Sequence, residues 1–109
     1  MQYVVRRYRT RDGREIVSEW LAGLGDVRAR ARIVARVARL AVGNFGDCKF
    51  LREGVSELRI DYGPGYRVYF GIVDRMVVLL LCGGDKRTQR ADVDRAAACL
   101  ADFKKRVAP

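Results

Sequence analysis

The stretch from residue 57 to residue 70 constrains the fold of this chain most, because two kinds of side chain alternate along it. The apolar side chains are Leu58, Ile60, Tyr62, Tyr66, Val68 and Phe70. The polar positions between them hold Glu57, Arg59, Asp61, Arg67 and Tyr69. Two alternating runs separated by Gly63, Pro64 and Gly65 predict a β-hairpin with one face packed on a core.

The length of the loop sets the register of this hairpin. A three-residue loop at residues 63–65 places Asp61 opposite Arg67 and Arg59 opposite Tyr69. A shift by one residue would put apolar side chains across from charged ones, which a half-buried sheet does not tolerate. The second face therefore gathers guanidinium, carboxylate and phenol groups, and we expect the function on this polar face.

The remaining segments predict an α+β fold of order β-α-α-β-β-β-α in a single domain spanning residues 1–109. The expected elements are a strand at 2–10, helices at 15–24 and 27–42, the hairpin at 57–70, a strand at 76–82 and a helix from 89 onward. Asp26 and Thr88 are the expected N-caps of the second and third helices. The continuous apolar run at 76–82 predicts a strand buried on both faces, ended by Gly83 and Gly84. Residues 43–54 predict a loop.

Arginine dominates the charge of the chain. Lysine and arginine number 22 against 13 acidic residues, giving a formal net charge of +9. The lysines are Lys49, Lys86, Lys104 and Lys105. Because arginine binds phosphate through a planar fork and stacks on bases, this balance favours a nucleic-acid ligand. An acidic protein partner explains it too, and the two interpretations are compatible.

The second predicted helix carries much of this charge. Its expected packing stripe is Val27, Ala31, Val34, Ala38 and Ala41. Its arginines Arg28, Arg32, Arg36 and Arg39 fall within an arc of about 80°, away from that stripe. A solvated face explains the arrangement. The alternative is a ridge that follows RNA phosphates, which makes Arg32 and Arg36 candidate RNA-binding residues.

Histidine is absent, and Cys48, Cys82 and Cys99 are widely spaced. This spacing argues against a zinc site, and a cysteine nucleophile would lack an imidazole partner. We therefore expect no metal or other cofactor, with Cys82 and Cys99 packed in the core. The sequence opens without a signal peptide, and its apolar runs fall far short of the roughly 20 residues that span a bilayer. We expect a cytoplasmic protein with no membrane partner.

The polar hairpin face and the loop after residue 84 hold the candidate catalytic residues. Lys86 and Arg87 precede a helix N-terminus, whose backbone amides favour an anion. If this loop lies beside the hairpin, Arg59, Arg67, Lys86 and Arg87 converge on one phosphate. Such a cluster would stabilise the extra negative charge of a pentacoordinate phosphorane.

Without histidine, the general base must be a carboxylate or a tyrosine. An ion pair with Arg67 would make Asp61 a poor base, so Glu57 is the preferred candidate. The alternative is that Glu57 and Asp61 only orient the arginines. Tyr69 lies on the polar face and is the candidate for stacking on an unpaired base, worth about 1–3 kcal/mol.

Residues 54–70, together with 84–89 and Asp92-Val93, resemble the addiction module killer proteins, a HigB-like branch of the RelE/ParE toxin superfamily. The resemblance covers essentially the whole chain. It implies an antiparallel sheet of about four strands with two N-terminal helices and one C-terminal helix. It also implies a type II toxin that cleaves mRNA on the translating ribosome without a metal, through attack of the ribose 2′-hydroxyl that leaves a cyclic phosphate. The implied partner is a cognate helix-turn-helix antitoxin.

The resemblance also assigns residues. Arg59 matches the basic residue of the Leu-Arg strand pair and Arg67 the arginine of the Tyr-Arg strand. Lys86 and Arg87 match the basic pair after the last strand, and Gln89 of the Lys-x-Thr-Gln motif would help to position the phosphate.

The chain departs from the superfamily in two ways. Glu57 stands where better-studied ribosome-dependent members carry lysine, and the last helix lacks the tyrosine or histidine that some members use. Because the superfamily also contains gyrase poisons, the alternative function is inhibition of DNA gyrase without nuclease activity. A third possibility, DNA binding by the Arg-rich second helix, is weaker because arginines without Asn or Gln beside them give little base readout.

Overall fold

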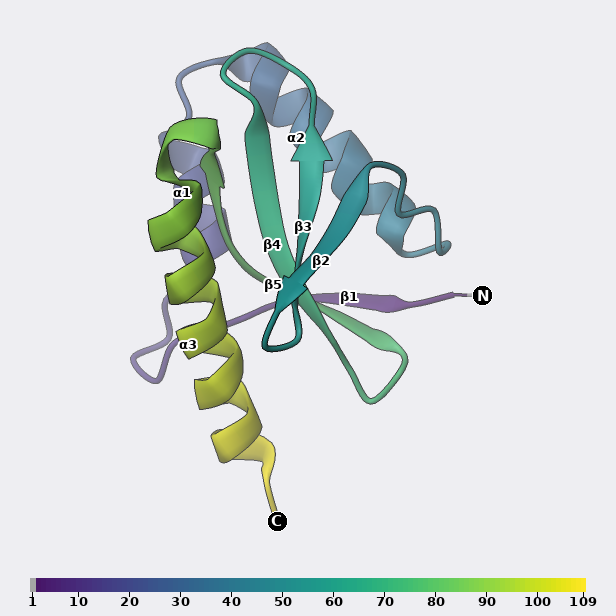
Figure 1. The fold of residues 1–109 in the computed structure, drawn as a ribbon, viewed down its shortest axis with the longest axis vertical. Coiled ribbons are helices and arrows are strands. Elements are labelled where there is room, and N and C mark those ends of the chain that lie inside the picture. Colours follow the sequence, from purple (N-terminus) through teal and green to yellow (C-terminus); the bar gives the residue numbers. More distant parts are fainter. Residues whose placement is uncertain (1) are drawn as a thin grey trace.

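The structure, a computed structural model that describes residues 2–109, is a five-stranded sheet with helices on both faces (Figure 1). The elements are β1 (Val4–Arg7), α1 (Ile16–Gly23), α2 (Val27–Leu40), β2 (Cys48–Arg52), β3 (Val55–Ile60), β4 (Tyr66–Val73), β5 (Val77–Asp85), the 3-10 turn η1 (Lys86–Thr88) and α3 (Gln89–Val107). The strand order is β1-β5-β4-β3-β2. The α+β class is confirmed. The sheet is mixed, however, because β1 runs parallel to β5 while the other pairs are antiparallel.

Strand β2 is the element that the sequence analysis missed. The stretch 43–54 was expected to form a loop, but Cys48–Arg52 pairs antiparallel with β3, placing Lys49 opposite Glu57. As an edge strand β2 buries little, and Phe50 is 66% exposed. Its weak apolar pattern, next to glycine-containing turns, explains why it could be taken for a loop.

The hairpin register differs from the expected one by two residues. Arg59 pairs with Arg67, so the loop comprises residues 61–65 instead of 63–65. The expected pairs of Asp61 with Arg67 and of Arg59 with Tyr69 are therefore wrong. A shift by two residues preserves the alternation of faces, so the same side chains still share the polar face.

Two glycines allow this longer loop. Gly63 and Gly65 have φ angles of 55° and 81°, in the left-handed region that other residues rarely adopt. The loop closes where the Gly65 N–H donates to the Tyr62 carbonyl at 3.1 Å.

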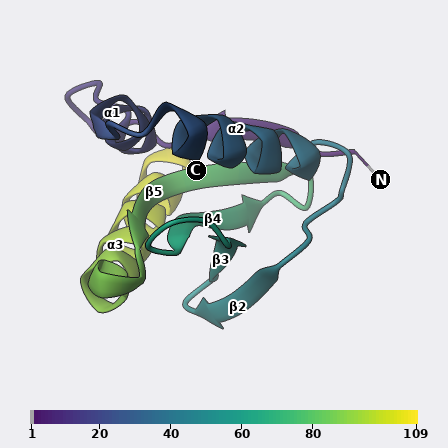
Figure 2. The same cartoon turned by 90° about the horizontal axis from the view of Figure 1, so that it is seen from above.

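Each face of the sheet has its own core. Helices α1 and α2 cover one face and α3 covers the other (Figures 1 and 2). The first core contains Val17, Ala29, Ile33, Leu40, Leu58, Ile60, Tyr66, Val68, Phe70, Val78 and Leu80, with Trp20 packed against it. The second contains Tyr8, Val55, Tyr69, Leu79, Leu81, Cys82, Ala96, Cys99 and Leu100. Strand β5 contributes to both cores, which confirms the expectation of a strand buried on both faces.

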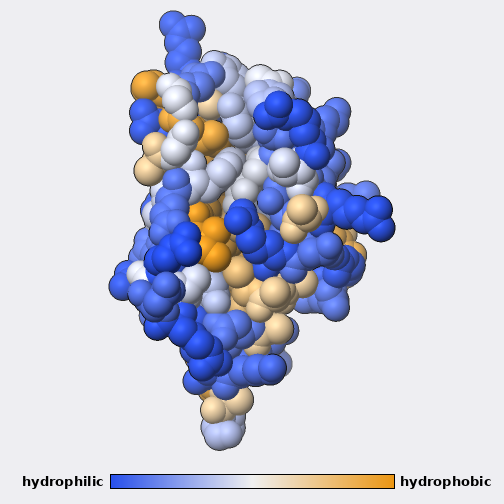
Figure 3. All heavy atoms as spheres, turned by 90° about the vertical axis from the view of Figure 1, so that its left-hand side faces the viewer, coloured by the Kyte–Doolittle hydropathy of each residue, from blue (hydrophilic) through white to orange (hydrophobic). Residues whose placement is uncertain are grey.

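The cysteines Cys82 and Cys99 are buried in the second core, as expected. Burial raises the pKa of the Cys82 thiol to about 12. From the side of α3, hydrophilic residues cover most of the surface around a narrow band of apolar residues (Figure 3). No helix within residues 2–109 combines the length and apolar character needed to cross a membrane.

Strand β5 continues through the glycine pair that was expected to end it. A Cβ atom on Gly83 would overlap the Trp20 ring, and one on Gly84 would overlap the Asp92 carboxylate of α3. These glycines therefore allow close approach of α1 and α3 to the strand, and they do not break it.

Helix α2 packs on a different stripe from the expected one. Ala29, Ile33 and Leu40 are buried, whereas Val27 and Val34 of the expected stripe are 66% and 52% exposed. The sequence offers two apolar stripes at helical spacing, and the one with the larger side chains faces the sheet. The expected N-cap is confirmed, since the Asp26 carboxylate accepts hydrogen bonds from the N–H groups of Arg28 and Ala29.

Candidate functional site

A hollow of about 210 Å³ opens beside the hairpin loop on the polar face of the sheet. Its lining residues are Asp47, Arg59, Asp61, Gly65, Arg67 and Lys86. Arg59 and Arg67 are direct cross-strand neighbours, and Lys86 follows the adjacent end of β5. The structure thus brings together three of the predicted catalytic residues: Arg59, Arg67 and Lys86.

Arg67 is fixed in place by the backbone around it. The side chain is 10% exposed, and Nη1 donates to the carbonyls of Gly65 and Tyr66 at 3.2 Å each. Nε is buried without a hydrogen-bond partner among the described residues, and the Glu57 carboxylate lies 3.7 Å from it. The guanidinium is therefore held at the hollow before any ligand arrives.

Glu57, the predicted general base, lies beside the arginines and does not line the hollow. It is 3% exposed, and its carboxylate is 3.9 Å from Arg59 Nε and 3.7 Å from Arg67 Nε. Gln89 Nε2 donates to the same carboxylate at 3.2 Å. Gln89, predicted to position the phosphate, therefore connects the start of α3 to this buried carboxylate.

Arg87 is not part of the cluster. Its guanidinium pairs with the Asp85 carboxylate at 2.9 Å, and its side chain is 80% exposed. The Asp85 carboxylate also accepts from the Arg87 backbone N–H, so it caps η1 where an external anion was expected. The hydrogen bonds from Arg87 hold the pKa of Asp85 below its ordinary range.

The expected cap Thr88 has a different role. Its side chain makes no capping hydrogen bond to the start of α3. Its hydroxyl instead donates to the Asp92 carboxylate, so both side chains join the first turn of α3 near Gly84.

Tyr69 cannot act as a stacking surface. Its side chain is fully buried, and its hydroxyl has no hydrogen-bond partner among residues 2–109. Burial first, and then the nearby Glu57 carboxylate, raises its pKa far above the ordinary value of 10.0. The face assignment was right, but α3 covers this part of the face, so the expectation of base stacking is wrong.

The two arginines of α2 predicted to bind RNA have different surroundings. Arg36 donates to the carbonyls of Arg59 at 2.7 Å and of Phe45 at 3.2 Å, which gives it a structural role. The guanidinium of Arg32 lies 4.6 Å from the centre of the Tyr62 ring. A second hollow, of about 290 Å³, contains Arg32, Ala35, Arg36, Arg39, Ile60 and Asp61. Asp61 lines both hollows, so the basic face of α2 adjoins the catalytic candidates.

Asp47 is a site residue that the sequence analysis missed. Its carboxylate lies 3.1 Å from Arg59 Nε and lines the first hollow. It precedes β2, in the stretch expected to be a loop. The apolar residues of Cys48–Arg52 are a weak strand signal, too irregular to have placed Asp47 beside the hairpin.

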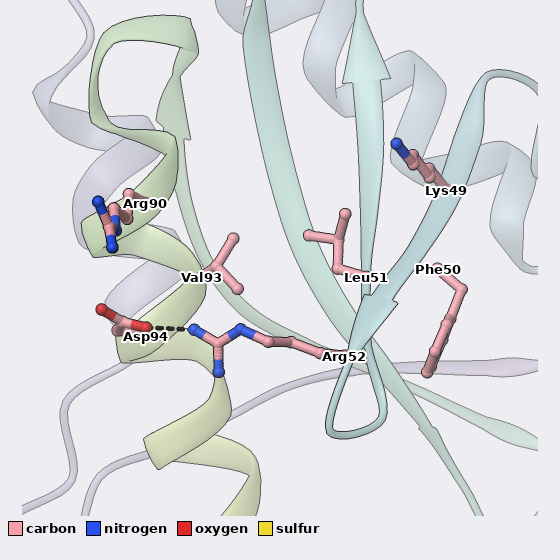
Figure 4. Close-up of a pocket in the computed structure, with 7 residues that line it drawn as sticks. All are labelled: Lys49, Phe50, Leu51, Arg52, Arg90, Val93 and Asp94. Atoms are coloured by element: carbon pink, nitrogen blue, oxygen red, sulfur yellow. Dashed lines mark hydrogen bonds and ion pairs between the residues drawn. The ribbon is translucent and has the colours of Figure 1, made fainter.

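A further pocket, of about 550 Å³, lies between β2 and α3 (Figure 4). Its lining residues are Lys49, Phe50, Leu51, Arg52, Arg90, Val93 and Asp94. An ion pair between Arg52 and Asp94 spans the strand and the helix. None of the predicted site residues lines this pocket. One of its walls is β2, which was expected to be a loop, so the pocket could not be predicted.

Comparison with known proteins identifies the fold through a solved structure and the family through a sequence relative. No protein-family model matches the chain. The structure of a double arginine-to-alanine mutant of E. coli toxin RelE in the free state superposes with a TM-score of 0.64 at 15% identity, covering 98% of this chain and 99% of that one. The RelE-like fold is thereby confirmed. A Haemophilus influenzae protein described as uncharacterized is 53% identical over 77 residues, or 71% of this chain and 78% of that protein. The chain belongs to the same family as this Haemophilus influenzae protein.

Proposed function

We propose that this chain is the toxin of a bacterial type II toxin-antitoxin system, of the HigB-like branch of the RelE/ParE superfamily. It acts in the cytoplasm as a metal-independent endoribonuclease on mRNA at the translating ribosome, and a cognate helix-turn-helix antitoxin neutralises it. The observation that carries the proposal is the convergence of Arg59, Arg67 and Lys86 on one hollow. The RelE-like fold and the neighbour's name as a toxin support it.

In the proposed reaction the cations bind the scissile phosphate. The ribose 2′-hydroxyl gives its proton to a carboxylate base, and its oxygen attacks phosphorus. The bond to the 5′-oxygen then breaks and that oxygen takes a proton from water, so the products carry a 2′,3′-cyclic phosphate and a 5′-hydroxyl. Arg67 is already fixed by two backbone carbonyls and by Glu57, so it stabilises the phosphorane without reorganising. Lys86 is exposed at the rim and adds a second cation.

Proton transfer fits Asp61 better than Glu57. Glu57 is buried against two guanidinium groups, which supports the orienting role that the sequence analysis kept as its alternative. Asp61 is exposed, lines the hollow and forms no ion pair with any residue from 2 to 109. Replacing Asp61 by Asn should therefore flatten the pH dependence of cleavage, whereas Glu57→Gln should lower the rate at every pH.

The basic face of α2 extends the proposed RNA path. Arg32 and Arg39 line the hollow that shares Asp61 with the first one, and neither forms an ion pair within residues 2–109. Both are therefore assigned to contacts with RNA phosphates. Arg36 lines the same hollow, but its hydrogen bonds to carbonyls give it the task of holding this surface together.

The test is pulsed expression followed by mapping of transcript 5′ ends. We expect arrested growth and new 5′-hydroxyl ends with the wild-type chain, and loss of both with Lys86→Ala. Lys105→Ala, which changes another exposed lysine at the far end of α3, is the matched control and should behave as wild type. Arg67→Gln tests the buried cation, with circular dichroism to confirm folding.

Full toxicity of both folded variants would contradict the site assignment. Growth arrest with intact transcripts and double-strand DNA breaks would instead support the gyrase-inhibiting alternative.

A further inference from the structure

We propose that the β2–α3 groove, the 550 Å³ pocket lined by Lys49, Phe50, Leu51, Arg52, Arg90, Val93 and Asp94, binds the nucleotide next to the scissile phosphate. This assignment rests on the proposed function, since it extends the same RNA strand beyond the hollow. Its ligand is a ribonucleotide, recognised through its base and its phosphate.

The groove begins beside the proposed reaction site. Lys49 on β2 pairs with Glu57 on β3, and the Glu57 carboxylate lies near the guanidinium groups of Arg59 and Arg67. From the opposite wall, Gln89 donates to Glu57, and the next residue, Arg90, lines the groove. The β2 wall and the α3 wall of the groove therefore both start next to Glu57, at the edge of the arginine cluster.

The groove combines an apolar floor with a cationic rim. Leu51 and Val93 face each other from β2 and α3 and pack against the second core (Figure 4). Lys49 and Arg90 form no ion pair with any residue from 2 to 109, so their charges remain available to a phosphate. Phe50 pairs with Ser56 and its exposed ring lies on the other face of the sheet, so a bound base rests on the apolar Leu51 and Val93 instead.

The ion pair between Arg52 and Asp94 closes the far end of the groove. It neutralises the one carboxylate in the lining and separates the groove from the next hollow along α3. That hollow is floored by alanines and leads toward Lys104. The closed end limits the ligand to the nucleotide adjacent to the cleaved bond, because a longer strand would have to displace this pair.

The experiment is an NMR titration of the folded chain with two probes, inorganic phosphate and adenosine 5′-monophosphate. Phosphate alone should shift the amide signals of Gly65 and Lys86 at the hollow. The nucleotide should shift these and also the signals of Leu51 and Val93. Lys49→Ser/Arg90→Ser should weaken the response at Leu51 and Val93 several-fold while leaving the response to phosphate at the hollow unchanged.

Lys104→Ser/Lys105→Ser removes the same charge from exposed positions beyond the ion pair and should titrate as wild type. A nucleotide that shifts only the hollow signals would overturn the groove assignment while leaving the proposed function intact. A hexaglutamate peptide that shifts the groove signals at lower concentration than the nucleotide would overturn it in favour of an acidic protein segment. Failure of phosphate to shift Gly65 and Lys86 would count against the proposed function itself.

Discussion

Helices α2 and α3 carry equal numbers of basic residues in opposite electrostatic settings. Helix α2 contains Arg28, Arg30, Arg32, Arg36 and Arg39 and no acidic residue. Helix α3 contains Arg90, Arg95, Lys104, Lys105 and Arg106 together with Asp92, Asp94 and Asp102. The carboxylates of α3 pair with cations on the helix itself, on β2 and near β1. Within residues 2–109, no arginine of α2 has a carboxylate at ion-pair distance.

The difference indicates what each set of charges does. The pairs on α3 connect it to Arg52 and Arg11, so its charges help to hold the helix on the fold. Helix α2 is held by its buried apolar face and by the hydrogen bonds of Arg36, while Arg28 and Arg32 repel each other at i,i+4. Unneutralised cations on this helix are consistent with the proposed contacts to RNA phosphates.

The largest expected effect comes from detaching the start of α3. Gly84→Ala would place a Cβ atom on the Asp92 carboxylate, and we expect it to lower the free energy of unfolding by about 1–3 kcal/mol or more. Urea denaturation measures this change. Gly25→Ala, where a Cβ meets no atom within 4 Å, is the matched control and should unfold near the wild-type midpoint. Equal midpoints for the two variants would mean that α3 does not depend on close contact with β5.

The next effect tests the arginines of α2 directly. Replacing Arg28, Arg32 and Arg39 by Gln should weaken binding to single-stranded RNA by roughly tenfold at physiological salt and reduce the slope of log affinity against log salt by about 2. The variant removes the proposed phosphate contacts of Arg32 and Arg39 and the unpaired charge of Arg28 beside them. Fluorescence anisotropy over a salt series measures both quantities.

The same loss of charge on α3 provides the control for this experiment. The triple Gln variant at Arg95, Lys104 and Lys105 should bind RNA as the wild type does, with the slope unchanged. If both triple variants lose affinity equally, net charge alone controls binding and the contrast between the helices has no functional meaning.

The smallest effect concerns the pairs that hold α3. Two hydrogen bonds, one from the Tyr8 hydroxyl and one from the Arg11 guanidinium, hold the pKa of Asp102 below its ordinary value of 3.8. This carboxylate therefore stabilises the fold at neutral pH, and its contribution is lost as the pH falls through the lowered pKa. Asp102→Asn should lower the melting temperature at pH 7, and the difference from wild type should shrink toward pH 3. A difference that is the same at both pH values would show that the ionised carboxylate is not responsible.

The sequence predicted the cationic cluster because a register shift of two residues leaves each side chain on the same face of the sheet. Arg59 and Arg67 share a face in the expected register and in the observed one. The register itself depends on Gly63 and Gly65 both adopting positive φ, which the sequence permits without specifying. Tyr69 was assigned to the right face, but the area that α3 covers depends on tertiary packing rather than on alternation.

The strand β2 explains the other misses. An edge strand buries one face incompletely, so Cys48–Arg52 lacks a strong periodic signal. Without that strand, neither Asp47 beside Arg59 nor the β2–α3 groove could be predicted. Local pattern therefore predicted the central hairpin and its two faces, but neither its register nor the rim of the site.

The hydrogen bonds of Arg36 have a mechanical consequence. One guanidinium joins α2 to the carbonyls of Arg59 and Phe45, so these hydrogen bonds hold the helix against the end of β3. These hydrogen bonds set the spacing between the arginines of α2 and the hollow. In the proposed function, an RNA strand that contacts both must span that distance, whatever its base sequence.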